Sequence, residues 1–316
     1  MPLAIPDYWQ LLALVAPVFL LFALGAAMRR ACALSDETEA GMLRVYVNVM
    51  YPALILRSVL GNPALRDPAN VVWPPLAGFG TIALGFAAAY YIGRALGLHV
   101  GSGLRTFAFT VGIYNYGFIP IPLTESLFGR GPLGVLLVQN MGCEVAVWSV
   151  GLLVLSGLSP REGWRKVVNA PICTLLAALV INRTGLVPPG VVMRVVDLVG
   201  GCAIPFGLML CGATLAPYLE RPRQLFDART TPVAWLLRLA VLPAAFLLLA
   251  RYAPFSIELK RVLVVQAAMP SGMMPLALAR HYGGQPLTAA QIILGTTALG
   301  LLVIPLWLRF GLAWVG

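Results

Sequence analysis

The chain alternates long apolar runs with short polar connections. The longest polar stretches, near residues 61–70, 158–166 and 217–229, extend over about a dozen residues each, which is too few for a second, soluble domain. An apolar run of about 20 residues is long enough to cross a bilayer as a helix. The pattern therefore predicts an all-α polytopic membrane protein with ten transmembrane helices. The predicted spans are 7–28, 41–60, 72–94, 104–127, 133–157, 167–184, 190–216, 230–251, 259–281 and 287–311.

Composition supports a membrane location. Only 11% of the 316 residues are charged and 59% are hydrophobic, whereas soluble domains carry about 25% charged residues. A soluble protein is excluded, and the lipid bilayer is the first predicted partner. The 32 glycines and 25 prolines indicate helices that are broken or closely packed in several places, which membrane helices tolerate.

The net charge of +10 is explained by basic residues that orient the helices in the membrane, and we predict no nucleic-acid partner. Basic residues cluster in short connections, and cytoplasmic connections are enriched in Lys and Arg. Thirteen of the 22 basic residues, with Arg238 counted among them, lie in or beside the connections that are cytoplasmic when the amino terminus is outside. We therefore predict both termini outside, with the connection around Pro160 in the cytoplasm. The clustered residues are Arg29, Arg30, Arg161, Arg165, Lys166, Arg221, Arg223 and Arg229.

The two halves of the chain share landmarks at a constant offset of 154 residues. Five helices in each half would make the second copy enter the membrane from the opposite side, as in transporters built from inverted repeats. We predict a first five-helix repeat at 1–158 and a second, inverted repeat at 159–316. The matching landmarks are Gly129, Pro132 and Leu133 in the first half, and Gly283, Pro286 and Leu287 in the second.

Two corresponding helices, the fourth and the ninth, combine helix-breaking residues with polar side chains. A proline removes a backbone donor and clashes with the preceding turn, and freed backbone groups are tolerated only beside protein or a water-filled cavity. The amino ends of half-helices favour an anion, so we predict the substrate site here; the alternative is a kink without a ligand. The predicted helix-breaking residues are Gly117, Pro120, Pro122, Gly272 and Pro275, and the predicted substrate-binding residues are Asn115, Tyr116, Gln139, Asn140, Met269, Pro270 and Ser271.

The same segments carry a family resemblance. IYNYGFIPIPL followed by LFG, and QAAMPSGMMPLALARHYGG near the carboxyl terminus, resemble the paired crossover helices of the auxin efflux carrier family, which includes plant auxin exporters and bacterial relatives. Asn115 stands where the family has an Asn before the first crossover, and Gln139 and Trp148 occupy family-like places. Pro120 departs from the family pattern.

The resemblance implies ten helices with crossed, discontinuous helices 4 and 9. It also implies a scaffold formed by helices 1, 2, 6 and 7 and a transport domain formed by helices 3–5 and 8–10, working by an elevator or rocking mechanism. The implied substrates are organic anions, including indole acetate and small dicarboxylates. A bacterial-type member without the long cytoplasmic loop would lie in the cell inner membrane, and a second copy of the chain, joined through the scaffold, is a further predicted partner.

Glu144 lies near the centre of the fifth predicted helix. An ionised carboxylate facing lipid there would cost about 2.5 to 3.5 kcal/mol, so it should face protein or water. One hypothesis is that Glu144 takes up a proton or helps to hold a cation; the alternative is a structural contact between helices. One central carboxylate is too few for an obvious sodium site, which favours H⁺ or facilitated transport over Na⁺. We predict no metal and no cofactor.

Four further polar residues are candidates for the pathway: Asn48, Asp197, Gln266 and Arg280. Arg280 could attract an anion, or its side chain could simply extend to the membrane interface. Glu125 maps by the repeat offset to position 279, beside Arg280.

Three function classes remain to be compared. We predict a secondary active or facilitative transporter, because the sequence contains no nucleotide-binding loop. An intramembrane enzyme is disfavoured by the lack of an HExxH motif or nucleophile elbow. A channel or membrane sensor with the same fold stays open, because channels also contain broken helices.

Overall fold

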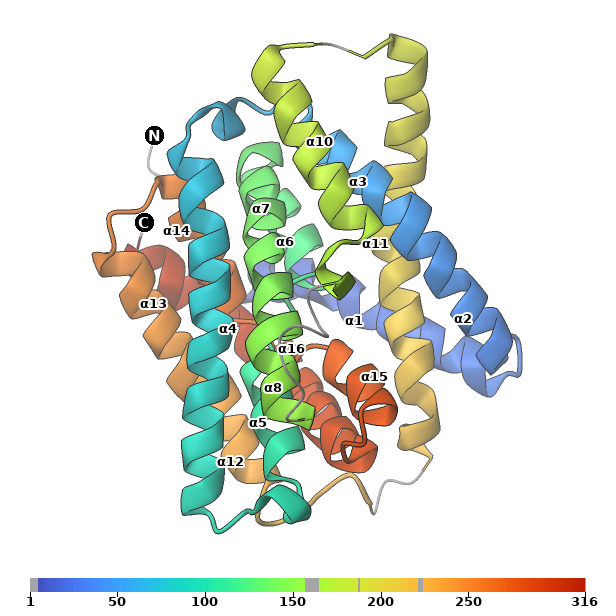
Figure 1. The fold of residues 1–316 in the computed structure, drawn as a ribbon, viewed down its shortest axis with the longest axis vertical. Coiled ribbons are helices and arrows are strands. Elements are labelled where there is room, and N and C mark those ends of the chain that lie inside the picture. Colours follow the sequence, from blue (N-terminus) through green and yellow to red (C-terminus); the bar gives the residue numbers. More distant parts are fainter. Residues whose placement is uncertain (1–4, 157–164, 187, 221–223, 316) are drawn as a thin grey trace.

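The computed structural model describes residues 5–156, 165–186, 188–220 and 224–315 as a bundle of helices (Figure 1). Within these ranges the chain forms no β-strand. The predictions made for Pro160, Arg161, Arg221 and Arg223 lie outside the described residues. In chain order the α-helices are α1 (Tyr8–Arg30), α2 (Asp36–Val45), α3 (Tyr51–Val59), α4 (Ala69–Ala95), α5 (Leu104–Gly112), α6 (Pro120–Phe128), α7 (Arg130–Ala146), α8 (Leu152–Ser156), α10 (Ala170–Thr184), α11 (Gly190–Leu219), α12 (Thr231–Leu236), α13 (Leu242–Tyr252), α14 (Ile257–Ala267), α15 (Met274–His281) and α16 (Pro286–Val315).

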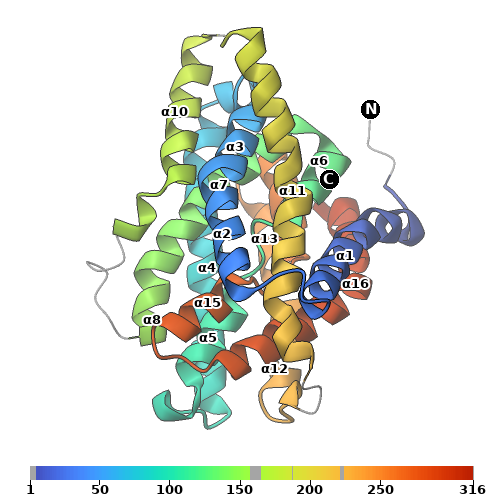
Figure 2. The ribbon, with the colours of Figure 1, turned by 90° about the vertical axis from the view of Figure 1, so that its right-hand side faces the viewer.

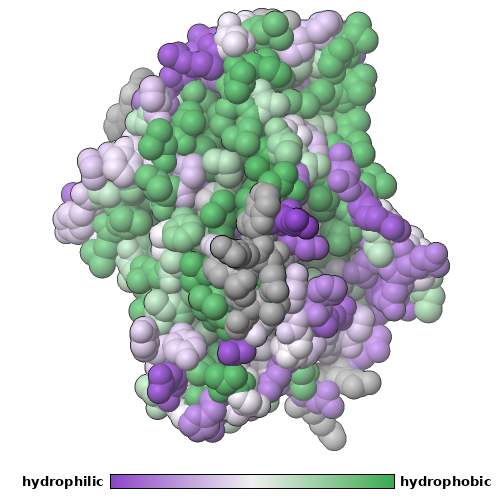
Figure 3. Space-filling view, viewed as in Figure 1, coloured by the Kyte–Doolittle hydropathy of each residue, from purple (hydrophilic) through white to green (hydrophobic). Residues whose placement is uncertain are grey.

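The all-helical architecture predicted from the sequence is confirmed for the described residues. Helices lie within every one of the predicted ranges, and hydrophobic side chains cover much of the face in Figure 3. The number of spans stays a prediction, because only six described helices are both long and apolar enough to cross a membrane alone. These six are Tyr8–Arg30, Ala69–Ala95, Arg130–Ser156, Gly190–Leu219, Thr231–Tyr252 and Pro286–Val315.

Local sequence explains where several helices begin. The Asp7 carboxylate accepts a hydrogen bond from the Gln10 backbone N–H at 2.8 Å, and the Gln10 side chain accepts one from the Asp7 N–H at 2.9 Å. This capping box satisfies two backbone donors at the start of α1. The first turn of α2 carries three acidic residues, which interact favourably with the positive end of the helix dipole.

Glycines allow the closest helix contacts. A Cβ atom at Gly25 in α1 would lie 1.9 Å from the Met209 carbonyl oxygen of α11, and one at Gly212 would lie 1.9 Å from the Phe22 oxygen of α1. Small residues let membrane helices approach backbone to backbone. Figure 2 shows α10, α3, α11 and α1 across one face of the molecule, where α3 packs against both α10 and α11.

Three π-helical turns join α-helices end to end. Tyr46–Met50 connects α2 to α3, Val147–Gly151 connects α7 to α8, and Leu237–Val241 connects α12 to α13. A π-helical turn inserts an extra residue and often marks a functional position in a helix. Each of these turns places a side chain close to the interrupted helices described next, namely Tyr46, Trp148 and Arg238.

Candidate functional site

The fourth and ninth predicted helices are each interrupted by a non-helical segment, residues 113–119 between α5 and α6 and residues 268–273 between α14 and α15. The two segments pair with each other. The Asn115 N–H donates to the Pro270 oxygen at 2.8 Å, and the Gly272 N–H donates to the Ile113 oxygen at 2.8 Å. An antiparallel bridge joins Tyr114 and Ser271 between them. An interrupted helix leaves backbone N–H and C=O groups without helical partners. Here the two segments supply partners to each other.

Two of the predicted helix-breaking residues, both glycines, lie in the interruptions, as does Pro270. Gly117 and Gly272 lie in the non-helical segments, and a Cβ atom at Gly272 would lie 2.9 Å from the Tyr114 oxygen, so a side chain there would push the paired segments apart. Pro120 is the first residue of α6 and Pro122 lies in its first turn, while Pro275 lies in the first turn of α15. A proline in the first turn loses no intrahelical hydrogen bond and favours helix initiation.

Tyr114 is the centre of one buried polar cluster. Its hydroxyl lies 2.9 Å from Thr81 Oγ1 of α4 and 3.3 Å from the Cys143 Sγ of α7. Gln139 donates to the same hydroxyl from its Nε2 at 3.5 Å. Tyr114 and Gln139 are both fully buried, so this cluster fixes the first interrupted segment against α4 and α7.

Tyr116 is the centre of a second cluster, on the same segment. Its hydroxyl donates to Glu144 Oε1 at 2.8 Å, and Trp148 Nε1 donates to Glu144 Oε2 at 3.0 Å. Gln266 Nε2 lies 3.4 Å from the Tyr116 carbonyl oxygen and 3.5 Å from Asn140 Oδ1. The structure thus brings together five of the residues singled out from the sequence, with Glu144 engaged by two donors.

The remaining predicted binding residues lie in the paired segments themselves. The Asn115 side-chain oxygen accepts from the N–H groups of Phe118 at 3.0 Å and Ile119 at 3.3 Å. Asn115 therefore supplies one acceptor to two N–H groups directly before α6. Met269 and Ser271 are buried, and the Ser271 N–H donates to Thr296 Oγ1 of α16 at 3.2 Å.

Several buried polar atoms around these segments have no hydrogen-bond partner among the described residues. They include Gln139 Oε1, Gln266 Oε1 and Ser271 Oγ. Buried polar atoms in proteins are almost always paired with protein, water or a ligand. This arrangement can therefore accept hydrogen bonds at the amide oxygens and donate one from the serine hydroxyl to a small polar molecule. In the described part of the chain, no group of three or more His, Cys, Asp or Glu side chains is placed to hold a metal ion.

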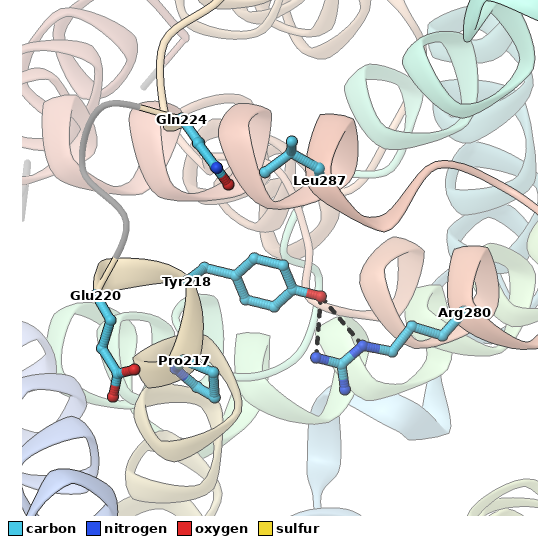
Figure 4. A pocket seen from close by; sticks show the side chains of 6 residues that line it. All are labelled: Pro217, Tyr218, Glu220, Gln224, Arg280 and Leu287. Carbon is cyan, nitrogen blue, oxygen red and sulfur yellow. Dashed lines mark hydrogen bonds between the residues drawn. The ribbon is translucent and has the colours of Figure 1, made fainter.

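Arg280 lies away from the paired segments, at an exposed cleft of about 390 Å³ (Figure 4). Its guanidinium donates to the Tyr218 hydroxyl from Nε at 3.1 Å and from a terminal nitrogen at 2.9 Å, and its central carbon lies 5.4 Å from the centre of the Tyr218 ring. Glu125 does not approach Arg280; it forms an ion pair of 2.6 Å with Arg57 of α3.

Two pathway candidates face the surface. Asn48 is exposed and donates to the Arg44 oxygen of its own helix at 2.9 Å. Asp197 is also exposed and lies 3.9 Å from Arg130 in a loose ion pair. Neither side chain forms a hydrogen bond with the two buried clusters. Gln266, by contrast, is fully buried within the second cluster.

Arg238 is the main residue that the sequence interpretation placed wrongly. It was counted beside a cytoplasmic connection, but its side chain is 0% exposed, and its guanidinium carbon lies 5.4 Å from the centre of the Tyr114 ring. Its position in the sequence indicates burial, because Arg238 stands eight residues inside the apolar run 230–251. Tyr114, which links Arg238 to the paired segments, was also missed.

Comparisons with known proteins agree with this picture. The family model described as "Membrane transport protein" matches residues 11–166 and 158–308. A protein named as an uncharacterized transporter from Methanothermobacter thermautotrophicus is 30% identical over 301 residues, covering 93% of this chain and 96% of the relative. An uncharacterized transporter from Methanocaldococcus jannaschii is 22% identical over 283 residues, covering 87% and 90%. The chain therefore belongs to the membrane transport protein family, the auxin efflux carrier family that its two motifs resemble.

Proposed function

We propose that this membrane transporter is a secondary active or facilitative carrier of small organic anions, with the substrate held where the two interrupted segments pair. The observation that carries the proposal is a pair of buried hydrogen-bond donors beside that pairing, Ser271 Oγ and Asn140 Nδ2, which have no partner among the described residues. The half-helices α6 and α15 begin beside it, and the amino ends of helices favour negative charge.

The proposed architecture has two inverted five-helix repeats, at 1–158 and 159–316, with helices 4 and 9 crossing at their interruptions. The scaffold would contain α1, α2, α3, α10 and α11, and the transport domain would contain the remaining helices. Helix packing supports this division, since α1 and α3 pack on α11 whereas α4 packs on α5 and α7. Movement of the second group against the first would carry the site across the bilayer by an elevator or rocking motion.

Glu144 is the proposed proton site. Its carboxylate lies in the same cluster as Tyr116 and Gln266, so a change in its charge would act on the first interrupted segment directly. A proton is favoured over Na⁺ because Glu144 contributes the one carboxyl group of the two buried clusters, and a carboxyl group can take up and release a proton. The proposed location is a bacterial inner membrane, with both termini outside. Two copies of the chain would form a homodimer through the scaffold.

The test is a thermal-shift screen of mono- and dicarboxylates, indole acetate included, on the purified protein. The screen is run at two pH values, with and without sodium. We expect at least one carboxylate to stabilise the protein, since a ligand that binds only the folded state raises the melting temperature. Stabilisation by none of them would overturn the substrate class.

Proteoliposomes then separate a carrier from a channel. Saturable uptake and exchange of the stabilising anion would support a carrier. An ohmic single-channel current carried by that anion would overturn the carrier mechanism and favour a channel with the same fold.

A further inference from the structure

Arg238 is a buried cation without a counter-ion among the described residues. It lies in the π-helical turn Leu237–Val241 between α12 and α13 and is 0% exposed. None of its three guanidinium nitrogens has a hydrogen-bond partner in the ranges that the structure describes. No described carboxylate forms an ion pair with it, whereas Arg57, Arg29 and Arg130 each have an acidic partner.

Two aromatic rings lie against the Arg238 guanidinium. The guanidinium carbon lies 5.4 Å from the Tyr114 ring centre and 5.3 Å from the Phe246 ring centre, and the two rings meet edge to face at 5.4 Å. Cation–π contacts compensate part of the lost hydration, but a guanidinium has five N–H donors and the rings provide no conventional acceptor. A charged residue within a membrane span is costly and is retained mainly for function.

Tyr114 connects this charge to the proposed substrate site. It forms the bridge to Ser271 of the second interrupted segment, and its hydroxyl receives the Gln139 amide. The Ser271 hydroxyl, which has no partner among the described residues and can donate to a carboxylate, is therefore on a direct neighbour of Tyr114. An anion at the paired segments would have Arg238 across one aromatic ring, in an interior where charge is poorly screened.

Glu144 is bonded to Tyr116, two residues further along the same short segment. The rings of Tyr114 and Tyr116 meet edge to face at 6.2 Å; Tyr114 contacts Arg238, and Tyr116 donates to Glu144. The site thus has one positive group at one tyrosine and one carboxyl group at the next. A first substrate carboxylate is attracted by Arg238, but a second would meet the carboxyl group of Glu144.

We propose that Arg238 is the specificity-determining residue of the site and that it selects anions with a single carboxylate over neutral molecules and dicarboxylates. The inference rests on the proposed function, whose substrate class it narrows. Arg280 is not required for this selection, because it is exposed and already bonded to Tyr218.

The experiment measures binding to the full chain in detergent by isothermal titration calorimetry. The probes are butyrate, butyramide and succinate, together with indole-3-acetate and indole-3-acetamide. We expect the wild-type protein to prefer each monocarboxylate over its amide, and butyrate over succinate. Arg238→Met should weaken monocarboxylate binding by about tenfold or more and bring the ratio of carboxylate to amide affinity close to one.

Two further variants control for charge and for loss of an arginine elsewhere. Arg238→Lys should keep a preference for the carboxylate that weakens as the pH rises, because a buried lysine loses its proton more readily than arginine. Arg251→Met removes an exposed arginine from α13, at the end of the same continuous helix, and should bind all probes like the wild type. Should Arg238→Met fail to fold, Arg238→Gln gives the same comparison, and the wild-type preference is itself a test.

The outcomes distinguish a failure of the role proposed for Arg238 from a failure of the proposed organic-anion function. Tight carboxylate binding by the wild type that Arg238→Met or Arg238→Gln leaves unchanged overturns the role of Arg238 and leaves the organic-anion function standing. A wild-type preference for succinate over butyrate also overturns the inference alone. A wild type that binds none of the carboxylates, here and in the thermal-shift screen, overturns both.

Discussion

The contact between α1 and α11 and the junction of the two interrupted segments are both deep in the molecule, yet they are built differently. At the first contact, glycines bring the backbones together, Gly25 of α1 against Met209 and Gly212 of α11 against Phe22. At the second, two backbone hydrogen bonds join the segments, and buried polar atoms around them have no partner in the part of the chain that the structure describes. The first contact is complete within the protein, whereas the second requires water or a ligand, which is why we place function there.

The largest expected effect is at the α1–α11 contact. Gly212→Leu would place a side chain where even a Cβ atom lies 1.9 Å from the Phe22 oxygen, and backbone cannot move aside cheaply. We expect a loss of stability above about 4 kcal/mol, seen as a loss of monodisperse protein in size-exclusion chromatography. Gly201→Leu, where the nearest atom is a side-chain nitrogen of Arg57 at 3.7 Å, should fold normally. Equal behaviour of the two variants would contradict the close contact.

Gly272→Ala, at the junction, should reduce transport much more than it reduces stability. The new Cβ atom would lie 2.9 Å from the Tyr114 oxygen, so the paired segments must separate slightly. Transport in proteoliposomes should fall by about tenfold or more, since a displacement of about 1 Å is enough to disrupt a binding site, while the melting temperature changes little. Gly80→Ala, on an exposed face of α4 with no atom within 4 Å, is the matched control. Normal transport by Gly272→Ala would remove the junction from the mechanism.

Glu144→Gln tests the proton proposal within the junction. Glutamine keeps the size of the side chain and can still accept from Tyr116, but it cannot take up and release a proton at neutral pH. We expect uptake to lose its dependence on pH while the protein still folds. Glu37→Gln, on the exposed surface of α2, should leave the pH profile unchanged. Full transport by Glu144→Gln with an unchanged pH profile would leave Glu144 with a structural role only.

The ion pair of Arg57 and Glu125 connects α3, which packs on α11, to α6, which begins at the junction. Their side chains are 21% and 26% exposed, and partly exposed ion pairs contribute up to about 1 kcal/mol. A double-mutant cycle with Arg57→Met and Glu125→Gln should therefore give a coupling energy of this size in thermal unfolding. A coupling of zero would show that the two regions are not linked through this pair.

The smallest effect is expected in a loop outside both regions. The Thr230 backbone N–H, at 2.8 Å, and the Arg229 N–H, at 3.0 Å, donate to the Asp227 carboxylate and lower its pKa, with further help from the Thr230 hydroxyl. This stabilisation is present above the unfolded pKa of about 3.9 and is lost as the pH falls through the folded pKa. Asp227→Ala should lower stability by about 1 kcal/mol or less at pH 7, and the difference from the wild type should shrink towards pH 3. A difference that stays constant between these pH values would rule out the carboxylate as its source.

Much of the helical layout can be predicted from the amino-acid sequence alone. Apolar run length located a helix within every predicted range, and Gly, Pro and polar residues together marked the two helices that are interrupted. The prolines were informative for a different reason than expected, because Pro120 and Pro275 begin the second half-helix in each case rather than unwinding the first. The asymmetry is physical, since the first turn of a helix does not need the N–H that proline lacks.

The sequence by itself determined that this chain is a helical membrane protein of a transport family and that two of its helices are broken. Hydrophobic length, charge and motif act locally along the chain, so they are visible without coordinates. Only the tertiary structure decided that Asn115 pairs with Pro270 and that Arg238 is buried against Tyr114 with no acidic partner among the described residues. Pairing partners and burial depend on residues more than 100 positions apart, and local pattern carries no information about which of them meet.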